Sequence, residues 1–259
     1  MKKLFSFELR KLFRMKLLYI CLGLAFVLAF LSTLITYFML KQEFGDMLAE
    51  ILGMYAPTGL SLLKSSLSGQ DCLIIIALFV TLYVCDDNRH NTLKNIYAKG
   101  YGRDGVYYSK LIIALAVSVV FVLLDWLSSF VFGCAFFGVG EADRYIAATL
   151  VVQLLAVLAY ASFFFFITTA IKKTGGSVVA NVLILMFAAQ LFSLLDYLIF
   201  RVSHNESFMI SEYWLDGIIK VVAGEEVVAK NFIVSTVLCL IYASGFIVGG
   251  MFINRKREV

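Results

Sequence analysis

The chain has 259 residues, of which 61% are apolar and 15% are charged, and its mean hydropathy is +0.91. Soluble domains carry about 25% charged residues, and here the apolar residues are concentrated in long, almost uncharged blocks. This composition excludes a soluble enzyme, a disordered chain and a secreted disulfide scaffold, and the single proline argues against a loop-rich β protein. The net charge of +4 does not indicate nucleic-acid binding.

The apolar blocks predict six transmembrane helices, because about 20 mainly apolar residues are needed to cross the hydrocarbon core. The block at 72–85 is short, and it spans only if its helix begins near Leu67 and includes Gly69, Gln70 and Asp71. The expected spans are 17–40, 67–85, 111–140, 145–171, 177–200 and 231–253. We therefore expect an all-α, multi-pass protein of the cell membrane, with residues 1–259 forming one transmembrane domain.

Charge sets the expected orientation, since Lys and Arg favour the cytoplasmic side of short loops. Six spans place 16 of the 22 Lys and Arg residues on one side and six on the other. Without the second span, basic segments would lie on both faces. Both termini and the loop 86–110 are therefore predicted to be cytoplasmic.

The first 16 residues predict a basic amphipathic helix in the inner interface. At 100° per residue, its apolar side contains Phe5, Leu9, Leu12 and Phe13, and its basic side contains Lys3, Arg10, Lys11 and Arg14. Two interpretations remain open: an orientation signal, or an elbow helix that touches a cytoplasmic partner.

The loop 86–110 predicts a second short helix. Asn91 is a good N-cap, and residues 92–99 can be helical. Gly100 can adopt the left-handed backbone conformation that commonly ends a helix. Leu93, Ile96 and Tyr97 share an apolar face. A helix of this length is unstable alone in water, so it must dock onto the membrane surface or another protein. We expect residue 96 to lie outside the hydrocarbon core, so that Ile96→Asp leaves folding intact.

Two outer segments also show helical spacing of apolar residues, at 44–55 and from Trp214 to Val222 before Gly224. Both are expected to rest on or dip into the outer interface. In the last span, Gly245 and Gly249 form a GxxxG face that favours close helix packing, more often within a bundle than between subunits.

Asp125 lies in the centre of the third span, where a carboxylate must face the bundle or a wet cavity. It can be functional. It can also be structural, hydrogen-bonded to a partner such as Gln153, Asn181 or Gln190, and we favour this second interpretation.

No enzyme motif stands in a suitable context. The GxGxxG string at 100–105 has no preceding strand, a Walker A sequence is missing, and the paired acids Glu225 and Glu226 lie far from either histidine. The five cysteines lack CxxC spacing and are expected to be buried apolar residues. We predict no catalytic, metal or cofactor site in this chain.

The loop 86–110 also carries a recognisable pattern. It contains an acidic residue, Asp87, then Thr-Leu-Lys-Asn at 92–95, Ala-Lys-Gly at 98–100, Arg103, and Tyr-Ser-Lys at 108–110. Together with residues 7–12 and 252–257, this pattern resembles the permease subunits of type-2 ABC exporters from Gram-positive bacteria. Three positions depart from the family pattern, with Asp87 in place of Glu, Asn91 in place of Gly and Ala98 in place of Ser.

The resemblance implies a non-enzymatic permease that pairs with a second permease subunit, identical or different, in the lipid bilayer. A separate ABC ATP-binding subunit would hold ATP and Mg, and exported cargo in this family includes antimicrobial peptides, drugs and lipid-linked molecules. The inner-loop helix would be the coupling helix, and the residues expected to couple to the ATPase are Asp87, Thr92, Leu93, Lys94, Ile96, Tyr97, Lys99, Gly100 and Arg103. The elbow-helix residues are Phe5, Leu9, Arg10, Leu12 and Phe13. The alternative is a multi-span anchor or sensor without transport activity.

The charge asymmetry makes the topology testable. In a cysteine-free background, a cysteine introduced at Asn95 should resist an impermeant thiol reagent in intact cells, whereas one at Glu225 should react. Labelling of the Asn95 position from outside would remove the second span from the topology.

Overall fold

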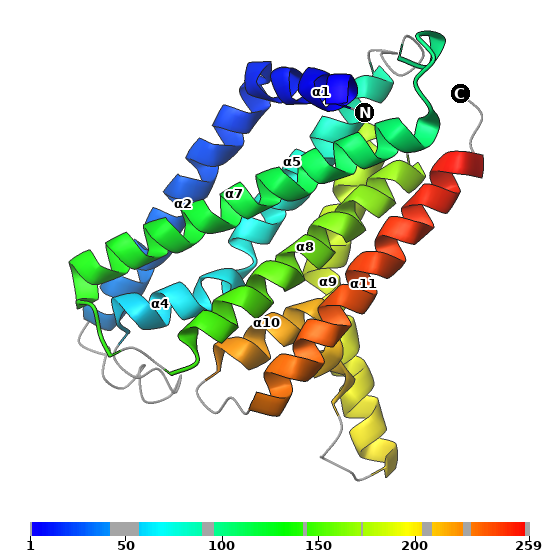
Figure 1. Cartoon of the computed structure of the whole chain (residues 1–259). Helices are drawn as coiled ribbons and strands as arrows, with labels where there is room; N and C mark the ends of the chain where they lie inside the picture. The colour runs from blue at the N-terminus through cyan, green and yellow to red at the C-terminus, as the bar shows by residue number, and fades with distance from the viewer. Residues whose placement is uncertain are drawn as a thin grey trace.

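The computed structural model describes residues 2–41, 57–89, 96–141, 144–171, 173–203, 209–224 and 229–256, which are helical with short connections (Figure 1). Five helices are long and apolar enough to cross a membrane, and a sixth span is formed by a bent pair. The five are α2 (Lys16–Lys41), α7 (Arg103–Phe137), α8 (Ile146–Ile171), α9 (Thr174–Ser203) and α11 (Ala229–Lys256). The all-α membrane fold is confirmed.

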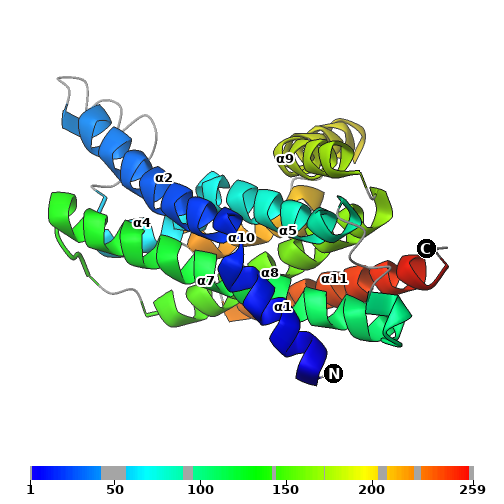
Figure 2. The same ribbon diagram turned by 90° about the horizontal axis from the view of Figure 1, so that it is seen from above.

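The bundle is organised around α8. Of the residues in its most apolar window, 61% are buried, against 17% in α9 and in α11. It contacts α11, α7, α9 and α5 (Asp71–Arg89). Its core side chains include Tyr160 and Phe164, whose rings stack on each other, and in α5 the buried rings of Phe79 and Tyr83 form a second stacked pair. Figure 2 shows α9 standing to one side of the bundle, next to α5.

The second span differs from the prediction. A continuous helix from Leu67 was expected, but α4 (Gly59–Ser65) and the 3-10 turn η1 (Ser66–Gly69) precede a separate helix that starts at Asp71. The two parts meet at 47°. The break lies at Gln70, which adopts a left-handed conformation with φ of 63° and donates a hydrogen bond from Nε2 to Oδ1 of Asp216 at 2.6 Å. The helix therefore begins at Asp71, where a carboxylate favours an N-terminus.

The outer helix predicted around residues 214–222 is present as α10 (Leu215–Ala223), preceded by η2 (Ile210–Tyr213). Its apolar face packs against the bundle, where Leu215, Ile218, Ile219 and Val222 are all buried. The predicted helix at 44–55 lies outside the described residues.

Polar contacts hold α4 and α10 inside the outer half of the bundle. The buried Lys64 donates from Nζ to the carbonyl oxygen of Gly224 at 2.9 Å, and Gln153 of α8 donates to the carbonyl of Lys64 at 2.7 Å. Thr149 donates to the carbonyl of Val222 at 3.1 Å. These bonds satisfy backbone carbonyls that lipid could not, so two short half-helices are stable there.

Glycines allow helices to pack closely at two places. A Cβ on Gly133 of α7 would lie 2.9 Å from the Cα of Gly59 in α4, and one on Gly250 of α11 would lie 2.3 Å from the Tyr107 hydroxyl. That hydroxyl donates to the carbonyl of Ile247 at 2.9 Å. Of the predicted GxxxG pair, Gly249 packs within the bundle, where an added Cβ would lie 3.2 Å from the Phe166 ring, whereas Gly245 meets no neighbour within 4 Å.

Candidate functional site

The helix α1 (Lys2–Arg14) and the C-terminal end of α11 lie at the same end of the bundle, together with the end of α5 and the start of α7 (Figure 1). Here α1 lies across the bundle and contacts α7. This end contains most of the residues that the sequence singled out. We call the contact region of α1, the end of α5 and the start of α7 the inner junction.

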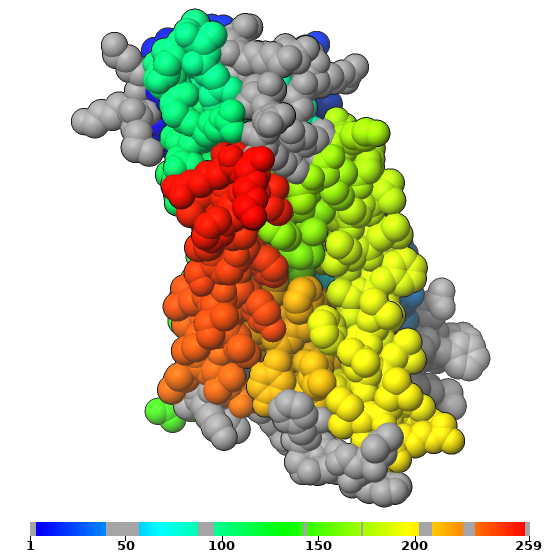
Figure 3. Space-filling model, turned by 90° about the vertical axis from the view of Figure 1, so that its right-hand side faces the viewer, coloured from blue at the N-terminus to red at the C-terminus, as the bar shows by residue number. Residues whose placement is uncertain are grey.

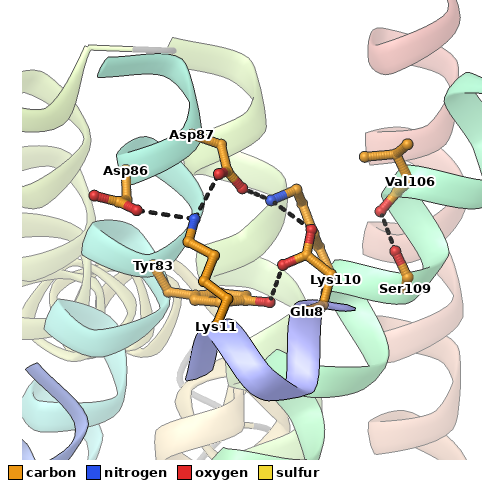
Figure 4. A network of polar contacts seen from close by, with 8 residues as sticks. All are labelled: Glu8, Lys11, Tyr83, Asp86, Asp87, Val106, Ser109 and Lys110. Atoms are coloured by element: carbon orange, nitrogen blue, oxygen red, sulfur yellow. Dashed lines mark hydrogen bonds and ion pairs between the residues drawn. The ribbon is translucent and has the colours of Figure 1, made fainter. Parts of the chain in front are cut away.

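A buried network of charges forms the centre of the inner junction (Figure 4). Glu8 of α1, Asp87 of α5 and Lys110 of α7 are 0%, 2% and 5% exposed. The Lys110 ammonium forms an ion pair with Glu8 Oε1 at 3.3 Å and a second, closer ion pair with Asp87 Oδ2. One buried cation therefore joins carboxylates from two other helices.

Two further side chains extend this network on α1 and α5. Lys11 lies 2.5 Å from Asp87 Oδ1 and 2.8 Å from Asp86 Oδ2. The Tyr83 hydroxyl donates to Glu8 Oε2 at 2.9 Å, and both ammonium groups lie within 6 Å of the Tyr83 ring centre, at 5.9 Å for Lys11 and 5.5 Å for Lys110. Charges alternate in sign along the chain of contacts, which offsets the cost of removing them from water.

A small apolar cluster lies beside the network. The cluster joins Leu4 of α1, Ile96 of the segment before α7, and Val106 of α7, which are buried against one another. Tyr97 and Tyr101 pack on them. Residues 96–98 are helical, and Gly100, with φ of 81°, donates from its backbone N–H to the carbonyl of Tyr97 at 2.9 Å. The left-handed stop predicted at Gly100 is confirmed.

The structure corrects one expectation about this loop. Ile96 was expected to dock onto the membrane surface or another protein, but it is only 8% exposed and packs on Leu4 of the same chain. An aspartate there would be buried among apolar side chains, so Ile96→Asp would disturb the inner junction itself. Asp87 is likewise inside the junction rather than on its surface. Thr92, Leu93 and Lys94 lie outside the described residues.

The remaining predicted residues lie on the exposed surface of the inner junction. Lys99, Gly100 and Arg103 are exposed, and Tyr97 is half-buried, which raises the pKa of its phenol despite the opposing effect of Arg103. On α1, Arg10 is exposed, as are Phe5, Leu9 and Phe13.

The α1 helix has three faces rather than the predicted two. Leu12 turns inward with Leu4 and Glu8, at a spacing of one helical turn, and Lys11 joins the network. Phe5, Leu9 and Phe13 form an exposed apolar face that suits the bilayer. The sequence analysis did not single out Glu8. Its position between Leu4 and Leu12 on one face of the helix could have indicated a buried carboxylate.

The C-terminal end of α11 is attached to the same region. Arg255 donates from Nη2 to Asp104 Oδ2 at 2.7 Å and from Nε to Oδ1 at 3.1 Å. Figure 3 shows the end of α11, in red, against the green segment that begins α7. The pair is exposed and contributes little stability alone, but it joins α11 to the start of α7.

Asp125 is 7% exposed and faces the bundle from α7. The partners proposed for it are wrong: Gln153 bonds to Lys64, Asn181 bonds to Thr81 and Thr168, and Gln190 is exposed. Its carboxyl group lies beside Ser66, in η1 at the break of the second span, and Oδ2 is buried with no hydrogen-bond partner among the described residues.

The sequence also matches a known protein family. The model for the ABC-2 family transporter protein matches residues 4–189, which is more than half of the chain. The chain belongs to the ABC-2 transporter family. No curated protein matches it. It is therefore a multi-pass permease of the cell membrane, and the match covers α1, the inner junction and the break in the second span.

Removing the central cation of the junction should destabilise this ABC-2 permease. Lys110→Met leaves Glu8 and Asp87 buried without their shared partner, which costs about 3–5 kcal/mol. Thermal unfolding of the detergent-solubilised chain measures the loss. Lys99→Met, at an exposed lysine, is the control, and equal stability of the two variants would contradict the account of the network.

Asp125 permits a test of structural against functional roles. We expect Asp125→Asn to keep assembly and transport, because the amide keeps hydrogen-bonding capacity at this buried position. Asp125→Leu removes that capacity and should lower the unfolding temperature. Vesicle transport and thermal unfolding are measured side by side. An Asn variant that assembles normally and does not transport would show that the charge is functional.

Proposed function

We propose that this permease subunit is driven by a separate ABC ATP-binding subunit that docks on the inner junction, and that it exports its cargo together with a second permease subunit. ATP and Mg would be held by the ATPase, since this chain has no Walker A sequence. The family resemblance suggests an antimicrobial peptide, a drug or a lipid-linked molecule as cargo.

The observation that carries this proposal is a set of ion pairs that connects three helices next to the exposed residues Lys99, Gly100 and Arg103. Lys110 links α1, α5 and α7 through buried carboxylates, and Ile96 anchors the loop to α1. A force applied at Lys99 or Tyr97 would reach two spans directly, because the connecting contacts are buried and paired. Packed elements of this kind shift between discrete arrangements rather than deforming continuously.

Docking on this surface would use charge and an aromatic side chain. Tyr97 is half-buried and Lys99 and Arg10 are exposed, which fits a protein groove with acidic edges. An anchor or sensor would have no need for an exposed loop fixed to the spans in this way.

Copurification tests the proposal. A tagged chain should retain the ATP-binding subunit in mild detergent, and Lys99→Glu combined with Arg10→Glu should weaken that binding roughly tenfold, because two favourable charge contacts are reversed. The variant should unfold at the parent temperature, since both residues are exposed.

Lys256→Glu, at an exposed lysine near the end of α11, is the matched control and should bind as the parent does. Mass spectrometry of the bound proteins identifies the partner. A parent chain that retains no ATP-binding subunit, or a double variant that binds and stimulates ATP hydrolysis normally, would contradict the proposed docking surface.

A further inference from the structure

The turn η2 lies within the outer half of the membrane-spanning bundle. At its start, Asp196 of α9 accepts hydrogen bonds from the backbone N–H groups of Ile210 at 2.6 Å and Ser211 at 3.0 Å. At its end, the Tyr242 hydroxyl donates to the carbonyl oxygen of Tyr213 at 3.2 Å. Asp196 is near the outer end of α9, whereas Tyr242 is in the middle of α11. The turn therefore descends from the outer end of the spans toward the middle of the bundle.

Ring contacts place the deepest point of this segment at Trp214. Its ring centre lies 5.0 Å from that of Phe192 in α9, 5.7 Å from that of Tyr242 in α11 and 6.3 Å from that of Phe163 in α8. All three partners are more than two helical turns from either end of their helices. From Trp214, α10 returns to the outer end of α8, where the carbonyl of Val222 accepts the hydrogen bond from Thr149.

The bundle does not cover one side of η2. Met209 and Tyr213 are 47% and 39% exposed, and Glu212 between them is exposed as well. Figure 3 shows this segment and α10, in light orange, at the surface between α11, in red, and α9, in yellow. Glu212 forms no ion pair and no side-chain hydrogen bond with the residues that the structure describes.

Hydrocarbon is a poor neighbour for this surface. Irregular backbone at membrane depth is found only where protein buries it or water reaches it. Carboxylates within the membrane likewise face a bundle or a water-filled cavity, because lipid does not solvate their charge. Protein does not bury the exposed side of η2, so water is the remaining cover for Glu212.

We propose that the exposed side of η2 lines a water-filled recess open to the outside, in which Glu212 binds a cationic group. The neighbouring carboxylates already have partners, since Asp196 accepts two backbone N–H groups and Asp216 forms an ion pair with Lys220 at 2.7 Å. Glu212 therefore supplies the unpaired negative charge. A recess with low-dielectric walls strengthens its attraction for an ammonium or guanidinium group relative to bulk water.

This site deepens the proposed function by selecting cargo that carries a basic group, and that part of the inference rests on the proposed export. The recess itself does not depend on transport or on the ATPase, because it follows from the depth and the exposure of η2. The two ideas can therefore fail separately.

Charge-selective thiol labelling in intact cells tests the site. In a cysteine-free chain, Tyr213→Cys places the reporter next to Glu212. Leu240→Cys, 55% exposed on the opposite side of α11 from Tyr242, is the lipid-facing control at a similar depth. Methanethiosulfonates that carry trimethylammonium or sulfonate should modify Tyr213→Cys and not Leu240→Cys. Relative to the rates of the two reagents with a free thiol in water, the cationic reagent should be favoured roughly threefold to tenfold.

The charge preference should depend on Glu212. We expect Glu212→Gln to remove it and Glu141→Gln, at an exposed carboxylate after α7, to keep it. Both changes are at exposed side chains, so both variants should unfold at the parent temperature. Met209→Cys, one 3-10 turn before Glu212, is a second reporter that leaves the Tyr213 ring in place.

Three results would each overturn the inference: no modification of either reporter cysteine, equal modification of Leu240→Cys, or a cation preference that survives Glu212→Gln. Copurification of the ATPase is measured on the same variants. If it persists while the labelling fails, the proposed function stands and only the recess is wrong.

Discussion

The structure depends most on the pairing of buried charges at the inner junction. Glu8, Asp87 and Lys110 are almost fully removed from solvent, and each is tolerable there only because it contacts an opposite charge. This need for pairing fixes three helices relative to one another. If α1 left the bundle, Lys110 would lose Glu8 and keep only the Asp87 carboxylate as a partner. Apolar contacts alone would permit sliding, whereas ion pairs specify one register.

The outer half of the bundle uses polar groups differently. There Lys64, Gln153 and Thr149 bond to backbone carbonyls, and Gln70 bonds to Asp216 across the break in the second span. These contacts stabilise two half-helices where lipid would leave carbonyls unsatisfied. Between the two polar layers lies an apolar and aromatic core that includes Phe79, Phe121 and Phe164. The inner layer is a network of ion pairs between side chains, whereas in the outer layer Lys64, Gln153 and Thr149 all donate to backbone carbonyls.

Much of the fold was predictable because span length, charge bias and apolar spacing are local properties of the sequence. The stop at Gly100 and the helix before Gly224 were predicted for the same reason. The break at Gln70 was not, because it is stabilised by Asp216, a contact between distant parts of the chain. The site was predicted in part: Asp87 and Ile96 were chosen as contact residues for a partner, and their side chains are buried inside the chain. Burial of a short loop depends on which helix crosses it, and the sequence alone did not place α1 over residue 96.

The most direct test of the central claim is a double-mutant cycle between Glu8 and Lys110. Unfolding free energies are measured for Glu8→Gln, Lys110→Met and the double variant under the same conditions. The account predicts that the double variant is more stable than the sum of the single losses implies, by about 1–3 kcal/mol, because each single change strands the other charge. Losses that add to within about 0.5 kcal/mol would show that the two charges do not interact, and would contradict the account.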